Sequence, residues 1–240
     1  TLNLKGDLTV AGSGLLQNTN SSNLGQFNFT GVGDGLTDAT TQTIDIASTS
    51  GNENRYITFS VKNGAYVKQI NRDFELGANS SLIIENGGTY DFGFNGTTAL
   101  NLAISGSQTG TVFNLQEGGV LKITSPDGIT TTAGVGNVRT VASNRTYDQV
   151  ATFWYIGRED QLTGNAVSTG STGKQMIVEL ASNSLQLRPS NSLAFSNSTT
   201  ISATGGKLDV RKGQFIESET EFVTACSGTL YMAQGTLYKI

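Results

Sequence analysis

The residues best suited to chemistry form two short charged clusters, Arg72-Asp73-Phe74-Glu75 and Arg158-Glu159-Asp160. Enzymes that act on acidic polysaccharides combine clustered carboxylates, which bind calcium or transfer protons, with an Arg or Lys that neutralises a uronate. No second acidic cluster recurs about one structural repeat away from either cluster to complete such a site. The pattern therefore favours solvated charges at turns, and a polysaccharide-active enzyme is the alternative.

Several catalytic and metal-binding classes are excluded because the chain contains no His and a single Cys, Cys226. Hydrolases that use a His base, zinc sites and internal disulfides all need residues that are missing. Asp34 and Asp38 are candidates for a calcium site, but the Asp-x-Asp-x-Asp-Gly spacing of a calcium loop is absent, which favours a turn. The run Glu217-Ser218-Glu219-Thr220-Glu221 favours a charged strand edge over a cation site. We predict no cofactor and no catalytic residue.

The aromatic run Phe153-Trp154-Tyr155 is the candidate for ligand binding. Side chains alternate across a strand, so one aromatic ring of this run faces outward whichever face is buried. An exposed ring can stack on the apolar C–H face of a sugar. Trp154, with Tyr155 and Arg158 beside it, therefore forms a candidate glycan-binding group, and a contact between neighbouring coils is the alternative that we favour.

The composition is small, polar and uncharged. Gly, Ser, Thr and Asn make up 105 of the 240 residues, charged residues are 14% and the net charge is −4. Nucleic-acid binding normally needs a basic patch, so we expect no nucleic-acid partner. No apolar run approaches the roughly 20 residues that span a bilayer, so we expect no membrane span in this segment.

Strand signals are dense, and a short signature recurs among them. Apolar residues alternate with polar ones in runs of three to five residues that Gly, Asn or Ser interrupt, as is typical of β-strands. The signature is Gly-x-Leu/Tyr-x-apolar, and its copies begin at Gly6, Gly88, Gly119, Gly206 and Gly228. Neighbouring copies lie 31 or 22 residues apart, a spacing typical of solenoids. We predict an all-β fold, a right-handed parallel β-helix whose stacked coils bury a shared core.

A β-sandwich is the competing fold. The dipeptide Asn-Gly occurs at 63–64, 86–87 and 95–96, and it is the strongest short-range signal for a β-hairpin. Antiparallel hairpins in two facing sheets would give β-sandwich modules instead of stacked coils.

A longer repeat suggests two modules. Phe27-Asn28-Phe29-Thr30-Gly31 matches Phe153-Trp154-Tyr155-Ile156-Gly157 at an offset of 126 residues. We predict β-solenoid modules over 1–137 and 138–240 that form one continuous stack. The chain begins at Thr1 without Met and ends on an apolar alternation, so we also expect it to be a fragment of a longer chain.

The second module resembles a known class of repeats. The aromatic strand Ala151–Gly157, the motif Gln161-Leu162-Thr163-Gly164 and the stretch Gly205–Val210 resemble the repeat modules of Bacteroidetes cell-surface adhesin-like proteins exported by the type IX secretion system, and Phe27–Phe92 resembles the same pattern. The resemblance implies an extracellular stalk or adhesin on the bacterial cell surface, anchored by a separate C-terminal sorting domain. It supplies no shared catalytic residues.

The expected function is therefore that of a non-enzymatic segment that acts in surface attachment or as a rigid spacer. The resemblance implies the secretion translocon as a partner during export, and surface glycans or neighbouring cells as later partners. The alternatives are a fragment of a polysaccharide-active β-helix enzyme and a carbohydrate-binding module around Trp154.

Overall fold

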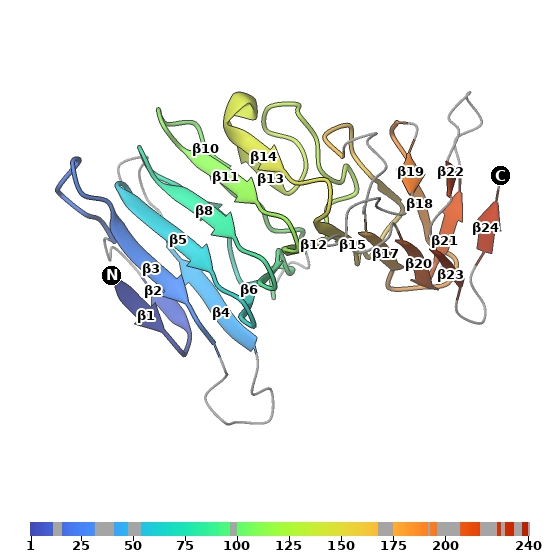
Figure 1. The fold of residues 1–240 in the computed structure, drawn as a ribbon, viewed down its shortest axis with the longest axis horizontal. Helices are drawn as coiled ribbons and strands as arrows, with labels where there is room; N and C mark the ends of the chain where they lie inside the picture. Colours follow the sequence, from blue (N-terminus) through green and yellow to red (C-terminus); the bar gives the residue numbers. More distant parts are fainter. Residues whose placement is uncertain are drawn as a thin grey trace, which may run out of the picture.

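The computed structural model is a stack of coils that advances from the N-terminal to the C-terminal end of the molecule (Figure 1). It describes residues 1–11, 16–31, 41–47, 54–96, 100–167, 175–191, 193–195, 207–216, 225–226, 229–232 and 237–239. Every pairing between named strands in these ranges is parallel. This confirms the prediction of an all-β parallel β-helix.

Two sheets form the main walls of the stack. The six-stranded sheet has the order β1 (Leu2–Leu4), β3 (Gly25–Phe29), β5 (Ile57–Val61), β8 (Ser81–Ile84), β11 (Val112–Leu115) and β14 (Arg145–Tyr147). The nine-stranded sheet, here called the long sheet, has the order β2 (Leu8–Val10), β4 (Thr41–Ile46), β6 (Tyr66–Gln69), β9 (Thr89–Asp91), β12 (Val120–Ile123), β15 (Thr152–Tyr155), β17 (Gln175–Glu179), β20 (Lys207–Lys212) and β23 (Thr229–Met232).

From β6 onward, each strand of the long sheet is followed along the chain by a strand of a shorter sheet. One contains β7 (Phe74–Glu75), β10 (Ile104–Gly106) and β13 (Val138–Thr140), and another contains β16 (Gln161–Leu162), β18 (Gln186–Arg188), β21 (Gln214–Ile216) and β24 (Leu237–Lys239). The pair β19 (Ala194–Phe195) and β22 (Ala225–Cys226) forms a two-stranded sheet. The one helical element in the described ranges is a 3₁₀ turn, η1 (Ala142–Asn144), and no helix there is long and apolar enough to cross a membrane.

The sequence signature marks one side of the stack. All five copies fall on the long sheet, at β2, β9, β12, β20 and β23. Tyr90 pairs with Leu121, and Leu208 pairs with Leu230, so the spacings of 31 and 22 residues each correspond to one coil. The repeat thus predicts both the period of the solenoid and its register on this sheet.

The core is a continuous stripe of inward-facing apolar side chains. On the six-stranded sheet, Phe29, Val61, Ile84 and Leu115 pair in succession and are fully buried. Rings also meet across the interior: Phe59 and Phe74 pack edge to face, with their centroids 5.0 Å apart. A single coil could not shield these side chains, so their burial depends on the neighbouring rungs.

The corner between the two main walls is a tight turn repeated from coil to coil. Four residues join the walls at 62–65, 85–88, 116–119 and 148–151. In the first of these, Ala65 N–H donates to the carbonyl of Lys62 at 2.9 Å, and Gly64 has φ +79° whereas Asn63 does not have a positive φ. This is the geometry of a type II turn, whereas a hairpin built on Asn-Gly requires a positive φ at both residues.

The turn geometry shows why the β-sandwich alternative is wrong. Asn63-Gly64 and Asn86-Gly87 join strands of different sheets, so neither dipeptide makes a hairpin. Near the third dipeptide, at 95–96, Phe94 and Asn101 form an isolated antiparallel bridge, the one antiparallel pairing in the described part of the chain.

The two segments that the 126-residue offset aligns lie on different walls. Phe27–Phe29 belongs to β3 of the six-stranded sheet, and Phe153–Tyr155 belongs to β15 of the long sheet. Strand pairs β11–β14 and β12–β15 cross the predicted boundary at residues 137 and 138, so rungs continue through it. The division into two modules stays a prediction.

Candidate functional site

The outer face of the long sheet carries a line of side chains in register, here called the outer row. Their inward-facing neighbours on the same strands, such as Tyr90 and Phe153, are buried in the core. The outer row consists of Lys68, Asp91, Lys122, Trp154, Ile177 and Asp209. Alternation along each strand and stacking between coils therefore bring Trp154 beside charged groups that lie far away in the sequence.

Trp154 is half-buried and held by three charged side chains. Its indole Nε1 donates a hydrogen bond to Glu179 Oε2 at 3.0 Å. The Nζ atom of Lys122 lies 4.4 Å from a ring centroid of the indole, and the Cζ atom of Arg211 lies 4.9 Å from one. Cations over an indole face are attracted by its quadrupole. A sugar that stacked on this ring would have to displace one of them, so the arrangement is that of a contact between coils.

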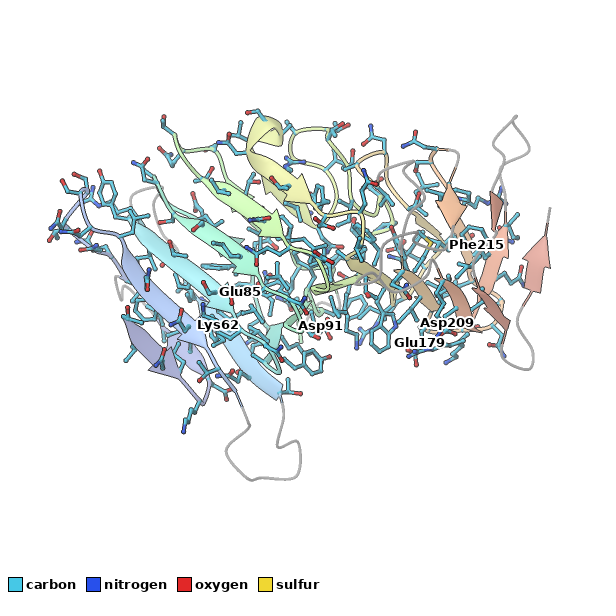
Figure 2. The ribbon with its side chains drawn as sticks, viewed as in Figure 1. Lys62, Glu85, Asp91, Glu179, Asp209 and Phe215 are labelled. Atoms are coloured by element: carbon cyan, nitrogen blue, oxygen red, sulfur yellow. The ribbon has the colours of Figure 1, made fainter. Side chains whose placement is uncertain are left out.

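The carboxylates of the outer row are satisfied by protein groups. Buried Asp91 accepts hydrogen bonds from the Tyr66 hydroxyl at 2.6 Å and the Gly93 N–H at 2.8 Å, and Lys122 Nζ lies 3.7 Å away. Asp209 is also buried and pairs with Lys207 and Arg211, at 3.0 Å and 3.1 Å. Figure 2 shows Asp91, Glu179 and Asp209 along the same side of the stack. Paired in this way, they stabilise the wall.

The structure separates the other predicted ligand-binding residues from Trp154. Tyr155 faces the core and is fully buried, with its hydroxyl donating to the carbonyl of Thr163 at 2.8 Å. Burial raises the pKa of Tyr155 well above its usual range, with a smaller contribution from Tyr147. The Tyr155 side chain therefore does not reach the surface beside Trp154, because a strand that exposes Trp154 must turn its neighbour inward. Arg158 is exposed and stacks on Phe94, with its Cζ atom 4.0 Å from the ring centroid.

The predicted metal candidates Asp34 and Asp38 lie outside the described residues, as do the three carboxylates of 217–221. Among the residues that the structure does describe, no group of three or more Cys, Asp or Glu side chains is placed to hold a metal ion.

The charged cluster at Arg72 lies beside a cleft. Arg72 Nε lies 2.6 Å from Asp45 Oδ1, and Asp73 Oδ2 lies 3.3 Å from Arg139 Nη1. These partners come from different coils, so the cluster is completed by stacking and not by its own segment. The cleft has a volume of about 480 Å³, and its lining includes Arg72, Asp73, Asp127 and Arg139.

Sequence reasoning missed this cleft as a site. Its lining comes from three separate turns, 70–73, 92–103 and 124–137, and from Arg139 of β13, and apart from the charged pair Arg72-Asp73 these segments carry no recognisable motif. The sequence signal that could have pointed to the cleft is the length of the connections 92–103 and 124–137. Both interrupt a pattern in which strands otherwise follow one another at short intervals.

No family model, curated protein or solved structure compared with this chain matches it.

Proposed function

We propose that this chain is a non-enzymatic segment of a secreted bacterial β-helix displayed on the cell surface, where it serves as a rigid spacer or an adhesive surface. The observation that carries the proposal is the long sheet, which stacks nine parallel strands from β2 to β23. Each rung is hydrogen-bonded to the next, so the stack behaves as a rod whose length grows by about 4.8 Å per coil.

Buried amide side chains support the rod by tying coils together. The side chain of Asn137, which is fully buried, accepts hydrogen bonds from the backbone N–H groups of Thr124 and Ser125 at 3.0 and 2.8 Å. Its Nδ2 donates to the carbonyl of Leu102 in the preceding coil at 2.6 Å. Such bonds oppose sliding of one coil over another, because sliding would leave buried polar groups without partners.

The surface chemistry suits an extracellular setting. The chain is rich in Thr, Ser and Asn and low in charge, so little of its stability depends on ion pairs that salt would screen. The resemblance to type IX secretion cargo supports export through that translocon and display on the cell surface.

Localisation tests the proposal directly. Intact cells of the producing bacterium are labelled with an antibody raised against this segment, with an antibody to a cytoplasmic protein as the control for lysis. We expect surface labelling that disappears when the type IX translocon is inactivated. Labelling that appears only after the cells are broken would rule out surface display.

A second candidate function, carbohydrate binding, is favoured by one observation, the cleft beside Arg72 and Arg139. Its ligand class follows from the chemistry of that cleft.

A further inference from the structure

Irregular turns are concentrated at the corner where the chain leaves the long sheet. The opposite corner repeats the same four-residue turn, whereas 12 residues (92–103) separate β9 from β10 and 14 residues (124–137) separate β12 from β13. Long connections on a rigid, repetitive scaffold are where binding residues are usually found. These two turns, the short turn 70–73 of the preceding coil and Arg139 of β13 line the cleft of about 480 Å³.

The cleft combines polar groups with an exposed apolar side chain. Its volume falls within the roughly 300–1,000 Å³ range of ligand pockets. Leu100 is 66% exposed, the largest value among the exposed large apolar side chains of the described residues, and it lies in the cleft wall. The polar lining includes the side chains of Asn71, Asn95 and Asn101.

The two guanidinium groups in the cleft are held in place by protein carboxylates. Arg72 pairs with Asp45, which also accepts a hydrogen bond from Asn71 Nδ2 at 2.8 Å. Arg139 pairs with Asp73 and donates from Nε to the carbonyl of Gly136 at 2.9 Å. A guanidinium has five N–H donors, so each can still bond a ligand while it stays fixed.

The charge of the cleft argues against an anionic ligand. Its lining contains two Arg and two Asp residues, so their formal charges cancel. Both Arg side chains already have carboxylate partners, while the side chain of Asp127 forms no ion pair within the described ranges. A uronate would add a further negative charge beside guanidinium groups that Asp45 and Asp73 already neutralise, and it would approach Asp127. Neutral sugar hydroxyls both donate and accept, and they fit this mixture of Asn, Arg and Asp.

A second depression continues the cleft along the stack. It has a volume of about 250 Å³, and both depressions are lined by Asp127. Its remaining lining comes partly from the same turn, 124–137, and partly from Leu162 of β16 and Ser190, which lies beyond β18, so it extends from the coil of the first cleft to later coils. A ligand that reaches both depressions lies along the stack axis, which suits a chain of sugars better than a single one.

We infer that the groove made by these two depressions binds a neutral polysaccharide chain. This inference deepens the adhesive half of the proposed function by naming a ligand class. It places binding at Arg139 and Leu100 and not at Trp154, whose ring is already in contact with Lys122 and Arg211.

The test uses the purified 240-residue chain on an array of neutral polysaccharides (β-glucans, mannans, xylans and galactans) and anionic ones (polygalacturonate and alginate). We expect retention on at least one neutral polysaccharide. Because hydrogen bonds to charged groups contribute strongly, Arg139→Ala should weaken that binding about tenfold or more. Leu100→Ser should also weaken it, and Trp154→Ala should leave it unchanged.

Leu24→Ser is the matched control, because Leu24 is also an exposed leucine and does not line the groove. Circular dichroism of each variant checks that the stack is intact, and Leu100→Ser keeps the test valid if Arg139→Ala fails to fold. Binding to no neutral polysaccharide, binding to anionic ones alone, or equal binding by the Leu100 and Leu24 variants would overturn the inference. Each of these results leaves surface display to be judged by the antibody experiment.

Discussion

Gln42 and Gln161 make the same set of hydrogen bonds at two different corners of the stack. Each side-chain oxygen accepts from the N–H of a glycine that lies two residues beyond a strand, Gly31 at 2.8 Å and Gly157 at 2.7 Å. Each side-chain nitrogen donates to two carbonyls of the preceding coil. These carbonyls belong to Leu4 and Gly6 for the first glutamine, and to Ile123 and Ser125 for the second.

The 126-residue repeat accounts for the glycines but not for the glutamines, because Gly31 and Gly157 are 126 residues apart whereas Gln42 and Gln161 are 119 residues apart. The hydrogen bonds of Gln42, here called a glutamine lock, lie at the corner between the six-stranded sheet and the long sheet. The glutamine lock of Gln161 lies at the corner between the long sheet and β16. The aligned segments therefore share a local corner structure although they lie on different walls. Glycine is required at these corners because a Cβ atom on Gly157 would lie 2.3 Å from Cδ of Gln161.

Replacing the buried glutamine should destabilise the stack. Gln161→Leu leaves the N–H of Gly157 without its acceptor and removes a donor from the carbonyl of Ser125, both inside the fold. We expect a loss of about 2–3 kcal/mol in the free energy of unfolding. Urea denaturation measures it, with Gln116→Leu as the control because the side chain of Gln116 is exposed. Equal shifts in the two variants would show that the lock contributes nothing.

The outer row should contribute to the free energy of unfolding more through its hydrogen bonds than through its ion pairs. Asp91→Ala removes the acceptor of the Tyr66 hydroxyl and of the Gly93 N–H, and we expect a loss of about 2–3 kcal/mol. Lys122→Met removes the longer 3.7 Å ion pair, a hydrogen bond of 3.2 Å to the Tyr66 hydroxyl and the cation over Trp154, and we expect a loss of about 1 kcal/mol.

Salt separates the two effects. Urea midpoints measured in low and high NaCl should show the Lys122→Met effect shrinking slightly as salt increases, because the ammonium group of Lys122 is partly exposed although its partner Asp91 is buried. The Asp91→Ala effect should persist. A larger loss for Lys122→Met than for Asp91→Ala would contradict this view of the row.

Stability should fall in alkali because buried tyrosines resist ionisation. Burial raises the pKa of Tyr155, and it raises the pKa of Tyr90 with a further contribution from the neighbouring charge of Asp91. Tyrosine in an unfolded chain ionises near pH 10. The folded state keeps these protons to higher pH, so their contribution is complete below about pH 10 and is lost as the pH rises above it.

The measurement is the urea midpoint as a function of pH. We expect little change caused by these tyrosines between about pH 7 and 9 and a decline above about pH 10. Tyr155→Phe should be less stable near neutral pH, because it loses the bond to the Thr163 carbonyl, but its decline in alkali should be shallower. Parallel curves for the two proteins would show that Tyr155 does not titrate in this way.

The repetitive part of the fold was predictable from sequence because its physics is local and periodic. A signature such as Gly119–Ile123 combines a corner residue with alternating inward positions, and one copy stacks on another at a spacing of one coil. The Asn-Gly dipeptides were ambiguous, since a corner turn and a hairpin both need a glycine with positive φ. Only the conformation of the preceding Asn63 distinguishes the two.

The sites were less predictable because they depend on register between coils. The surroundings of Trp154 include Lys122 from the preceding strand of the long sheet and Arg211 from β20, two strands further on. The partner of Asp73 is Arg139, 66 residues away. Because turns of unequal length precede these residues, no local sequence pattern predicts which strand of one coil lies over which strand of the next.

Stacking in register along the whole chain is the claim on which the rod, the core and the groove depend. Spin labels on outward positions of the long sheet test it most directly, in a Cys226→Ser background. One label at Thr41 is combined with a second at Thr152, Gln175 or Lys207, which lie four, five and six rungs away. Electron spin resonance should give distances that rise stepwise, near ~19, ~24 and ~29 Å between backbone positions. Distances that fail to increase in this order would contradict a continuous parallel stack.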